Sequence, residues 1–220
     1  MMTTNKLTKT FASGSLAIGV LAGAVLTATS ASAAMLTWAD WTSGIPLIEG
    51  DKQVTFKPNS ITGGFVADPL DDVALTKMGD HYYFVYDAET LGSPAPNTSS
   101  GSFTYTIEVT TPGWGIVGVD LDSNVSSNYG TVTETFAQIP GLELVSTNGS
   151  PVPATGFIGI PRNTLLTVTN TLAANPGENL LSFQNSFHQV YIPNVPEPGT
   201  ILGLLAVGGL GLVSRFKKQK

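Results

Sequence analysis

The chain has 220 residues, of which 10 are Lys or Arg and 16 are Asp or Glu, so its formal charge at pH 7 is −6. It contains no Cys and only two His, which excludes a disulfide framework, an iron–sulfur cluster, a Cys-ligated zinc site and a three-His zinc site within one chain. The negative charge also argues against nucleic acid as a partner, because phosphate contacts need Lys and Arg.

The first 33 residues have the organisation of a secretory signal peptide. Two lysines precede a short apolar segment at residues 11–26, and Ala31 and Ala33 fit the small-x-small rule for cleavage. We therefore expect an N-terminal signal helix that signal peptidase removes after Ala33. The alternative, an uncleaved membrane helix, fits less well because the apolar segment is short.

Residues 34–194 form the exported domain that we expect between two terminal signals. They contain four basic and fifteen acidic residues, a formal charge of −11 that the basic termini partly conceal. Such a domain should stay soluble outside the cell and be repelled by anionic polymers unless divalent cations bridge them.

Alternation of apolar and polar residues predicts β-structure throughout this domain. The clearest case is 102–110, where four apolar residues alternate with Ser, Thr and Glu: Phe103, Tyr105, Ile107 and Val109. Further strand candidates between turn residues are 54–56, 73–75, 80–86, 116–121, 131–136, 142–146, 164–171 and 180–192, the last bent or broken near Asn185. No part of 34–194 has a sustained helical period. We therefore predict an all-β fold, an antiparallel β-sandwich of the jelly-roll or Ig-like type.

Threonines recur at every second position in three of these segments: Thr104/Thr106, Thr131/Thr133/Thr135 and Thr167/Thr169/Thr171. A flat array of this kind would suit an ice-binding surface. The favoured interpretation is the solvent-facing side of a sheet, for which Thr is a natural residue, because the chain has no regular repeat.

A calcium site is the one candidate for a bound ion. Asp120, Asp122 and Asn124 alternate as the first ligands of an EF-hand loop do. That loop would then need Gly and Glu where the chain has Val125 and Thr131. Acidic residues at the rim of a sheet are therefore favoured, and a calcium site of another type stays open. A second acidic loop has the same ambiguity: Asp68, Asp71 and Asp72.

No catalytic residue can be assigned from the sequence. His81 and His188 are the only histidines, and the chain has no Gly-x-Ser-x-Gly nucleophile motif. Paired carboxylates for glycoside hydrolysis stay open, because any sandwich rim brings acidic residues together. A secreted hydrolase is thus the least favoured function.

Three tryptophans offer a different function. Trp38, Trp41 and Trp114 could stack on sugar rings if they were exposed, although packing in the core is the commoner use. A carbohydrate-binding module retained by polysaccharide is therefore an alternative function.

The C-terminus combines three features in a fixed order. Pro196, Glu197 and Pro198 favour an extended backbone. An apolar, Gly-rich segment follows, and 199–216 as a helix would span about 27 Å, close to the membrane hydrocarbon thickness. Basic residues end the chain: Arg215, Lys217, Lys218 and Lys220. Under the positive-inside rule these stay cytoplasmic and the preceding domain lies outside, in agreement with the N-terminal signal.

This order of features resembles the PEP-CTERM sorting signal of Gram-negative bacteria, over residues 195–220. The resemblance implies that an exosortase, a membrane-embedded transpeptidase, recognises the Pro-Glu-Pro element and removes the tail. It also implies an inner-membrane intermediate, a final place at the cell surface or outside the cell, and a link to exopolysaccharide or biofilm matrix. The same element is also named after the C-terminal domain of an ice-binding protein, which need not imply ice binding here.

The sequence thus predicts a signal peptide at 1–33, an exported domain at 34–194 and a sorting signal at 195–220. The favoured function is that of a non-enzymatic surface or matrix protein. Its expected partners are signal peptidase, the exosortase, the membrane before processing and exopolysaccharide. Calcium is the one cofactor that the sequence leaves open, at Asp120, Asp122 and Asn124.

Overall fold

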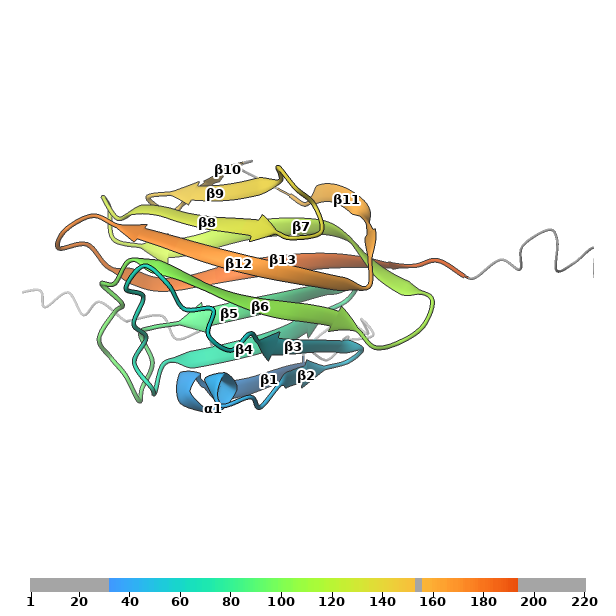
Figure 1. The fold of residues 1–220 in the computed structure, drawn as a ribbon, viewed down its shortest axis with the longest axis horizontal. Helices are drawn as coiled ribbons and strands as arrows, with labels where there is room; N and C mark the ends of the chain where they lie inside the picture. The colour runs from blue at the N-terminus through green and yellow to red at the C-terminus, as the bar shows by residue number, and fades with distance from the viewer. Residues whose placement is uncertain (1–31, 153–155, 194–220) are drawn as a thin grey trace, which may run out of the picture.

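A computed structural model describes residues 32–152 and 156–193, in which two antiparallel β-sheets pack face to face (Figure 1). The all-β fold predicted from the alternating pattern is confirmed. The signal helix and the membrane helix at 199–216 lie outside the described residues. Within the described residues, no helix is long and apolar enough to cross a membrane.

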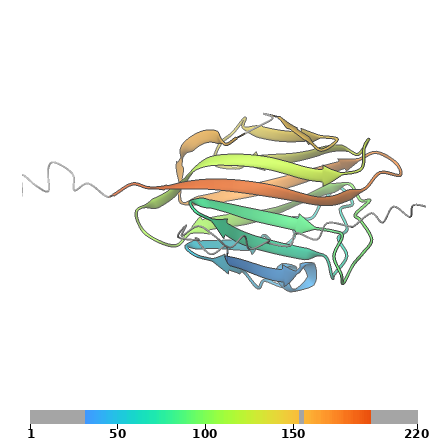
Figure 2. The same cartoon turned by 180° about the vertical axis from the view of Figure 1, so that it is seen from behind.

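Sheet A has six strands and appears in front in Figure 2. Their spatial order is β1 (Ser32–Thr37), β4 (Asp72–Met78), β5 (His81–Asp87), β13 (Leu180–Tyr191), β7 (Trp114–Val125) and β11 (Ile158–Asn163). The last strand of the chain, β13, therefore lies inside the sheet, between β5 and β7. It is one continuous strand through Asn185, so the expected break is absent, although its register with β7 shifts twice.

Sheet B has seven strands and faces the viewer in Figure 1. Their order is β10 (Ser150–Val152), β9 (Glu143–Thr147), β8 (Gly130–Phe136), β12 (Leu165–Ala174), β6 (Gly101–Val109), β3 (Lys52–Phe56) and β2 (Leu47–Glu49). The strand expected at 102–110 is β6, and its four alternating apolar residues are all buried.

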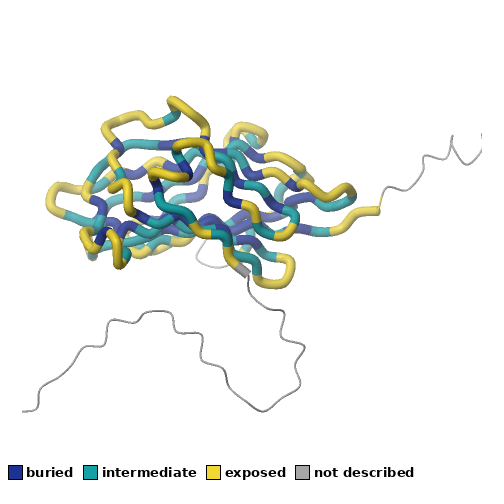
Figure 3. Tube along the Cα trace, turned by 90° about the horizontal axis from the view of Figure 1, so that it is seen from below, coloured by how far each residue is buried: buried dark blue, intermediate teal, exposed yellow. Residues whose placement is uncertain are grey.

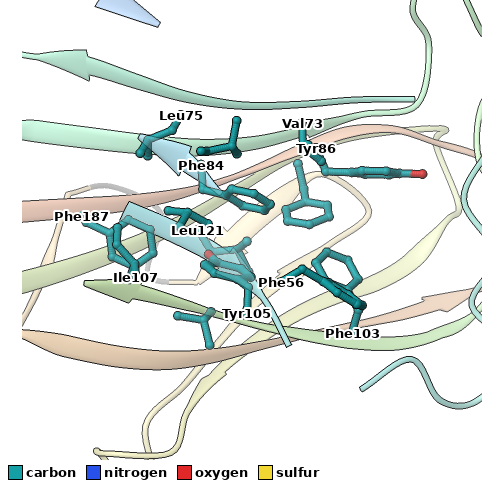
Figure 4. Close-up of a cluster of buried hydrophobic side chains, with 14 of the residues drawn as sticks. Phe56, Val73, Leu75, Phe84, Tyr86, Phe103, Tyr105, Ile107, Leu121 and Phe187 are labelled. Atoms are coloured by element: carbon teal, nitrogen blue, oxygen red, sulfur yellow. The ribbon is translucent and has the colours of Figure 1, made fainter. Parts of the chain in front are cut away.

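The core lies between the sheets and is rich in aromatic side chains (Figure 4). Phe84 of β5 and Tyr105 of β6 come from opposite sheets, and their ring centres are 4.4 Å apart. Alternation along strands such as β5 and β6 sends every second residue into this layer, as the burial colouring in Figure 3 shows. Each buried aromatic or aliphatic side chain contributes about 1.5–3 kcal/mol to stability.

A short helix, α1 (Trp38–Thr42), follows β1 and closes one edge of the core. Thr37 caps it by accepting a hydrogen bond from the backbone N–H of Asp40 at 3.2 Å. Trp38 and Trp41 are three residues apart, so both point from the same helix face into the core. Five residues are too few to produce a helical period, and α1 was therefore not predicted.

A polar cluster is enclosed within this apolar layer. Asn185 Nδ2 donates to Tyr105 Oη at 3.0 Å and to Asn170 Oδ1 at 2.9 Å, which links the two sheets. Glu134 of β8 stands opposite Asn170 in the β8–β12 register, and both of its carboxyl oxygens are buried without a hydrogen-bond partner. Burial raises the pKa of Glu134 well above its usual value, so the core favours the neutral acid.

Candidate functional site

A hollow of about 380 Å³ lies between two loops at one end of the sandwich, and residues 66–69 and 95–99 line most of it. Asp71, which is 1% exposed, also lines it. Asp71 Oδ2 accepts hydrogen bonds from Tyr86 Oη at 2.6 Å and from the backbone N–H of Asp68 at 2.9 Å. Its other oxygen, Oδ1, is buried without a hydrogen-bond partner. Burial raises the pKa of Asp71, which is the usual result when a carboxyl is desolvated.

The second acidic loop of the sequence is thus divided by the fold. Asp68 and Asp71 both line the hollow. Asp72 is instead the first residue of β4 and stands opposite Thr37 and Asp87 in the register. The hollow can hold a small polar ligand whose donor reaches Asp71 Oδ1.

Asp120, Asp122 and Asn124 lie along β7 rather than in a loop. Their alternate spacing puts them in a row on the outer face of sheet A, where Asp122 and Asn124 line a hollow of about 180 Å³ with Gln184 of β13. Within the described residues, no group of three or more His, Asp or Glu side chains is arranged to hold a metal ion. A calcium ion here would therefore need amide, hydroxyl or water ligands beside the carboxylates.

The two histidines meet across the β5–β13 pair. His81 and His188 are directly opposite in the register, and their ring centres are 4.9 Å apart. Phe157 packs against both rings, and His81 Nδ1 lies 3.3 Å from Tyr83 Oη. These contacts form an aromatic cluster on the outer face of sheet A.

The tryptophans have two different roles. Trp41 is 0% exposed and Trp38 is 5% exposed, and both pack edge-on against core aromatic rings such as Phe56, so neither is a platform for sugar rings. Trp114, at the start of β7, is half-buried and its ring centre lies 5.4 Å from that of Tyr191, which is 55% exposed. Of the three tryptophans, Trp114 is therefore the one that, with Tyr191, stays available for stacking.

The threonine arrays come together on the outer face of sheet B. Their strands β8, β12 and β6 are adjacent, and Thr169 stands opposite both Thr104 and Thr135. The hydroxyls of Thr104 and Thr169 are 2.8 Å apart. The arrays therefore form one continuous surface of hydroxyl and methyl groups, which the sequence order alone could not reveal because strand pairing joins distant segments.

The C-terminal segment follows directly after the centre of sheet A. β13 ends at Tyr191 and the described residues end at 193, so the motif residues Pro196, Glu197 and Pro198 and the basic residues at 215–220 lie outside them. The family model of the PEP-CTERM protein-sorting motif matches residues 194–218. The chain carries this sorting motif. No curated protein and no solved structure matches the chain.

The PEP-CTERM motif implies export, processing by an exosortase at the membrane and a subsequent place at the cell surface. It begins three residues after β13 ends. The sorted cargo is therefore the β-sandwich, joined to the motif by a very short connection.

The expected signal-peptidase site falls at the other end of the described chain. Ala31 lies outside the described residues, and Ala33 stands within β1, opposite Thr76 of β4. Cleavage after Ala33 would divide β1 and leave four of its pairs with β4, from Ala34 to Thr37.

Several buried polar residues were not singled out by the sequence, among them Lys52 and Glu134. Both occupy core-facing positions of alternating strands: Lys52 shares the face of Val54 and Phe56, and Glu134 that of Val132. The sequence did contain a sign of both residues: each is a charged residue at a position where the alternation predicts an apolar one.

Proposed function

We propose that this chain is a non-enzymatic protein of the cell surface or extracellular matrix, linked to exopolysaccharide. The exported β-sandwich is its working part, and an exosortase removes the C-terminal tail. The observation that carries this proposal is the match of the sorting motif to residues 194–218, directly after the last strand.

The physical chemistry of the chain supports this sequence of events. Two prolines around Glu197 favour an extended backbone, which a membrane enzyme can bind more readily than a paired strand. The acidic composition of residues 34–194 keeps the exported domain soluble. Its charge also means that contact with anionic polysaccharide needs bridging cations or neutral contact surfaces.

Mass spectrometry of the C-terminus of surface-localised protein tests the proposal. We expect the tail to be absent, with cleavage near Pro196-Glu197-Pro198. Substitution of Glu197→Ala, or of both prolines by Ala, should leave membrane insertion intact but block processing, so the full-length chain should accumulate in membranes.

Thr200→Ala is a matched control, because it changes a residue two positions after the Pro-Glu-Pro element, and it should be processed like the wild type. An intact Lys220 on wild-type protein at the surface would contradict the proposal. That result would indicate a plain membrane anchor.

Carbohydrate contact is a second candidate function, and the half-exposed pair Trp114 and Tyr191 favours it. Aromatic faces of this kind stack on sugar rings. A glycan array on the exported protein should then show binding that Trp114→Ala and Tyr191→Ala both reduce. Exposed Ile48→Ala, on β2 of the other sheet, should leave it unchanged. Binding that neither aromatic substitution reduces would remove this candidate.

A further inference from the structure

A buried lysine lies between the two sheets near the C-terminal end of β13. Lys52, on β3 of sheet B, has a 0% exposed side chain. Its Nζ lies 2.8 Å from Asp51 Oδ1 and contacts the side-chain carbonyl oxygen of Gln189, on β13 of sheet A. The two residues are 137 positions apart in the sequence, on strands that Figure 1 shows in different layers.

Two further groups complete the surroundings of the Lys52 amine. The ring of Tyr82 lies beneath it, with Nζ 4.4 Å from the ring centre. Tyr82 Oη donates to Asp51 Oδ1 at 2.6 Å, whereas Asp51 Oδ2 is buried without a hydrogen-bond partner. That oxygen is therefore free to accept a proton.

The surroundings make the Lys52 amine easier to deprotonate and keep the Asp51 carboxyl ionised beside it. Burial lowers the pKa of the Lys52 amine, and the neighbouring Asp51 only partly offsets this effect. Burial alone would raise the pKa of Asp51, but the hydrogen bonds from Lys52 and Tyr82 outweigh it and lower the pKa. Asp51 is thus an ionised base in contact with a desolvated amine.

We propose that Lys52 and Gln189 become joined by an intramolecular isopeptide bond, with Asp51 as the group that transfers protons. The site brings together a desolvated primary amine, a carboxamide in contact with it and a carboxyl within hydrogen-bonding distance. Desolvation activates lysine as a nucleophile. Fixed proximity can replace a concentration of about 10⁵–10⁸ M for a well-oriented pair, which makes an otherwise slow reaction of an amide feasible.

The reaction balances without a co-reactant. Asp51 accepts one proton from the Lys52 ammonium, and the nitrogen lone pair attacks Cδ of Gln189. The new bond joins Lys52 Nζ to Gln189 Cδ, and the bond from Cδ to Nε2 breaks. Asp51 returns its proton to the departing nitrogen, which also takes the second proton of the attacking amine and leaves as ammonium. An ammonium and a primary amide thus give a secondary amide and an ammonium ion, and Asp51 is regenerated.

The bond would fasten the strand that leads to the sorting motif. Gln189 is the last fully core-facing residue of β13, five positions before the motif begins. If the C-terminus is held at the cell surface, a pulling force acts on the domain through β13. The bond would transmit that force directly from β13 to sheet B. This mechanical role, though not the bond itself, rests on the proposed surface location. In a chain without Cys, the bond would also restrict the unfolded chain as a disulfide does.

Peptide mapping of the exported full chain tests the bond directly. We expect one branched peptide that contains both Lys52 and Gln189, lighter by one ammonia than the sum of its two linear parts. Trypsin should not cleave after Lys52, because the side chain no longer carries an amine. Finding Lys52 and Gln189 in two separate peptides of unmodified mass, in folded protein after prolonged incubation, would overturn the proposal.

Three variants separate the chemistry from folding. Asp51→Asn keeps the lysine and the amide but should leave them unjoined, and Gln189→Met should remove the branched peptide completely. Asp80→Asn changes an exposed carboxyl at the same end of the sandwich and should form the bond as the wild type does. A bond that forms fully in folded Asp51→Asn protein would contradict the role of Asp51. Because the wild-type map alone decides whether the bond exists, a variant that fails to fold does not weaken the test.

Discussion

At the scale of single residues, Glu134 stands out because it is an ionisable residue buried in a mostly apolar core. Its carboxyl is enclosed between the sheets, without a partner, and burial raises its pKa well above the usual range. The unfolded chain therefore releases this proton at lower pH than the folded chain does. Stability that is complete below the ordinary Glu pKa is lost as pH rises towards the folded-state value.

We predict that Glu134→Gln removes this loss. The free energy of unfolding of the wild type should fall relative to that of the variant by up to about 1.4 kcal/mol per pH unit above the ordinary Glu pKa. Urea unfolding at a series of pH values measures the difference. Glu143→Gln, an exposed position on the neighbouring strand β9, is the control and should leave the pH dependence unchanged. A wild type and a Glu134→Gln variant with parallel pH profiles would contradict the prediction.

Individual residue roles were harder to predict than strands. The alternation that buries Phe103 and Tyr105 is a local property of β6, so the sequence reveals it. The neighbours of Lys52, Asp71 and Glu134 come from strands far apart in the chain, so no local pattern specifies them. The burial of Trp38 and Trp41 agrees with the core packing that the sequence favoured for tryptophan, but the five-residue helix that positions them was not predicted.

At the scale of elements, the first prediction concerns β1, because the expected signal-peptidase site lies within this strand. Paired backbone is a poor protease substrate, so signal peptidase should act before Ala33 pairs with Thr76. N-terminal sequencing of exported protein should begin at Ala34. Ala31→Leu should block cleavage by removing the small side chain, whereas Ser32→Thr should be tolerated. Exported protein that retains Met1 would contradict this prediction.

The second prediction at this scale concerns calcium binding on the outer face of β7. Asp120, Asp122 and Asn124 form a row beside a shallow hollow, and we propose weak calcium binding there. By linkage, the Tm of the protein should then rise with millimolar calcium, and Asp122→Asn should abolish the rise. Asp40→Asn, on α1, is the control and should retain it.

An unchanged Tm would exclude the calcium site. If Asp71→Asn abolishes the rise in Tm and Asp122→Asn does not, the calcium site is in the hollow between the two loops and not on β7. In that hollow one oxygen of Asp71 has no hydrogen-bond partner.

Most long strands were predicted with ends correct to a few residues, because strict alternation and turn residues mark them. The strands that were missed are β1, β2, β10 and β11, which are short or lie at sheet edges. β2 and β10 have three residues each, too few for a period, and Gly159 and Pro161 interrupt the pattern of β11. The continuity of β13 through Asn185 was also missed, because a buried amide that hydrogen-bonds across the core resembles a break in an apolar strand.

At the scale of the whole molecule, sequence and structure describe different parts of the chain. The sorting motif is a local feature of residues 194–218 and is recognisable without a fold. The sandwich between the termini follows from alternation, but its surfaces depend on strand order. The threonine surface of β8, β12 and β6 and the Trp114–Tyr191 pair appear only when distant segments are brought side by side.

The last prediction concerns the basic residues at the end of the tail. Replacing Arg215, Lys217, Lys218 and Lys220 by Gln should weaken membrane retention, because the apolar segment is short and cytoplasmic charge sets its orientation. Full-length chain should then appear in the exported soluble fraction with its C-terminus intact, as measured by fractionation and mass spectrometry. Variants with a substituted Pro-Glu-Pro element should show the opposite distribution, because their full-length chain should stay in the membrane fraction. Gln219→Asn keeps the charge and should behave as the wild type. A charge-free tail that is retained and processed at the wild-type level would show that the apolar segment alone holds the chain for the exosortase.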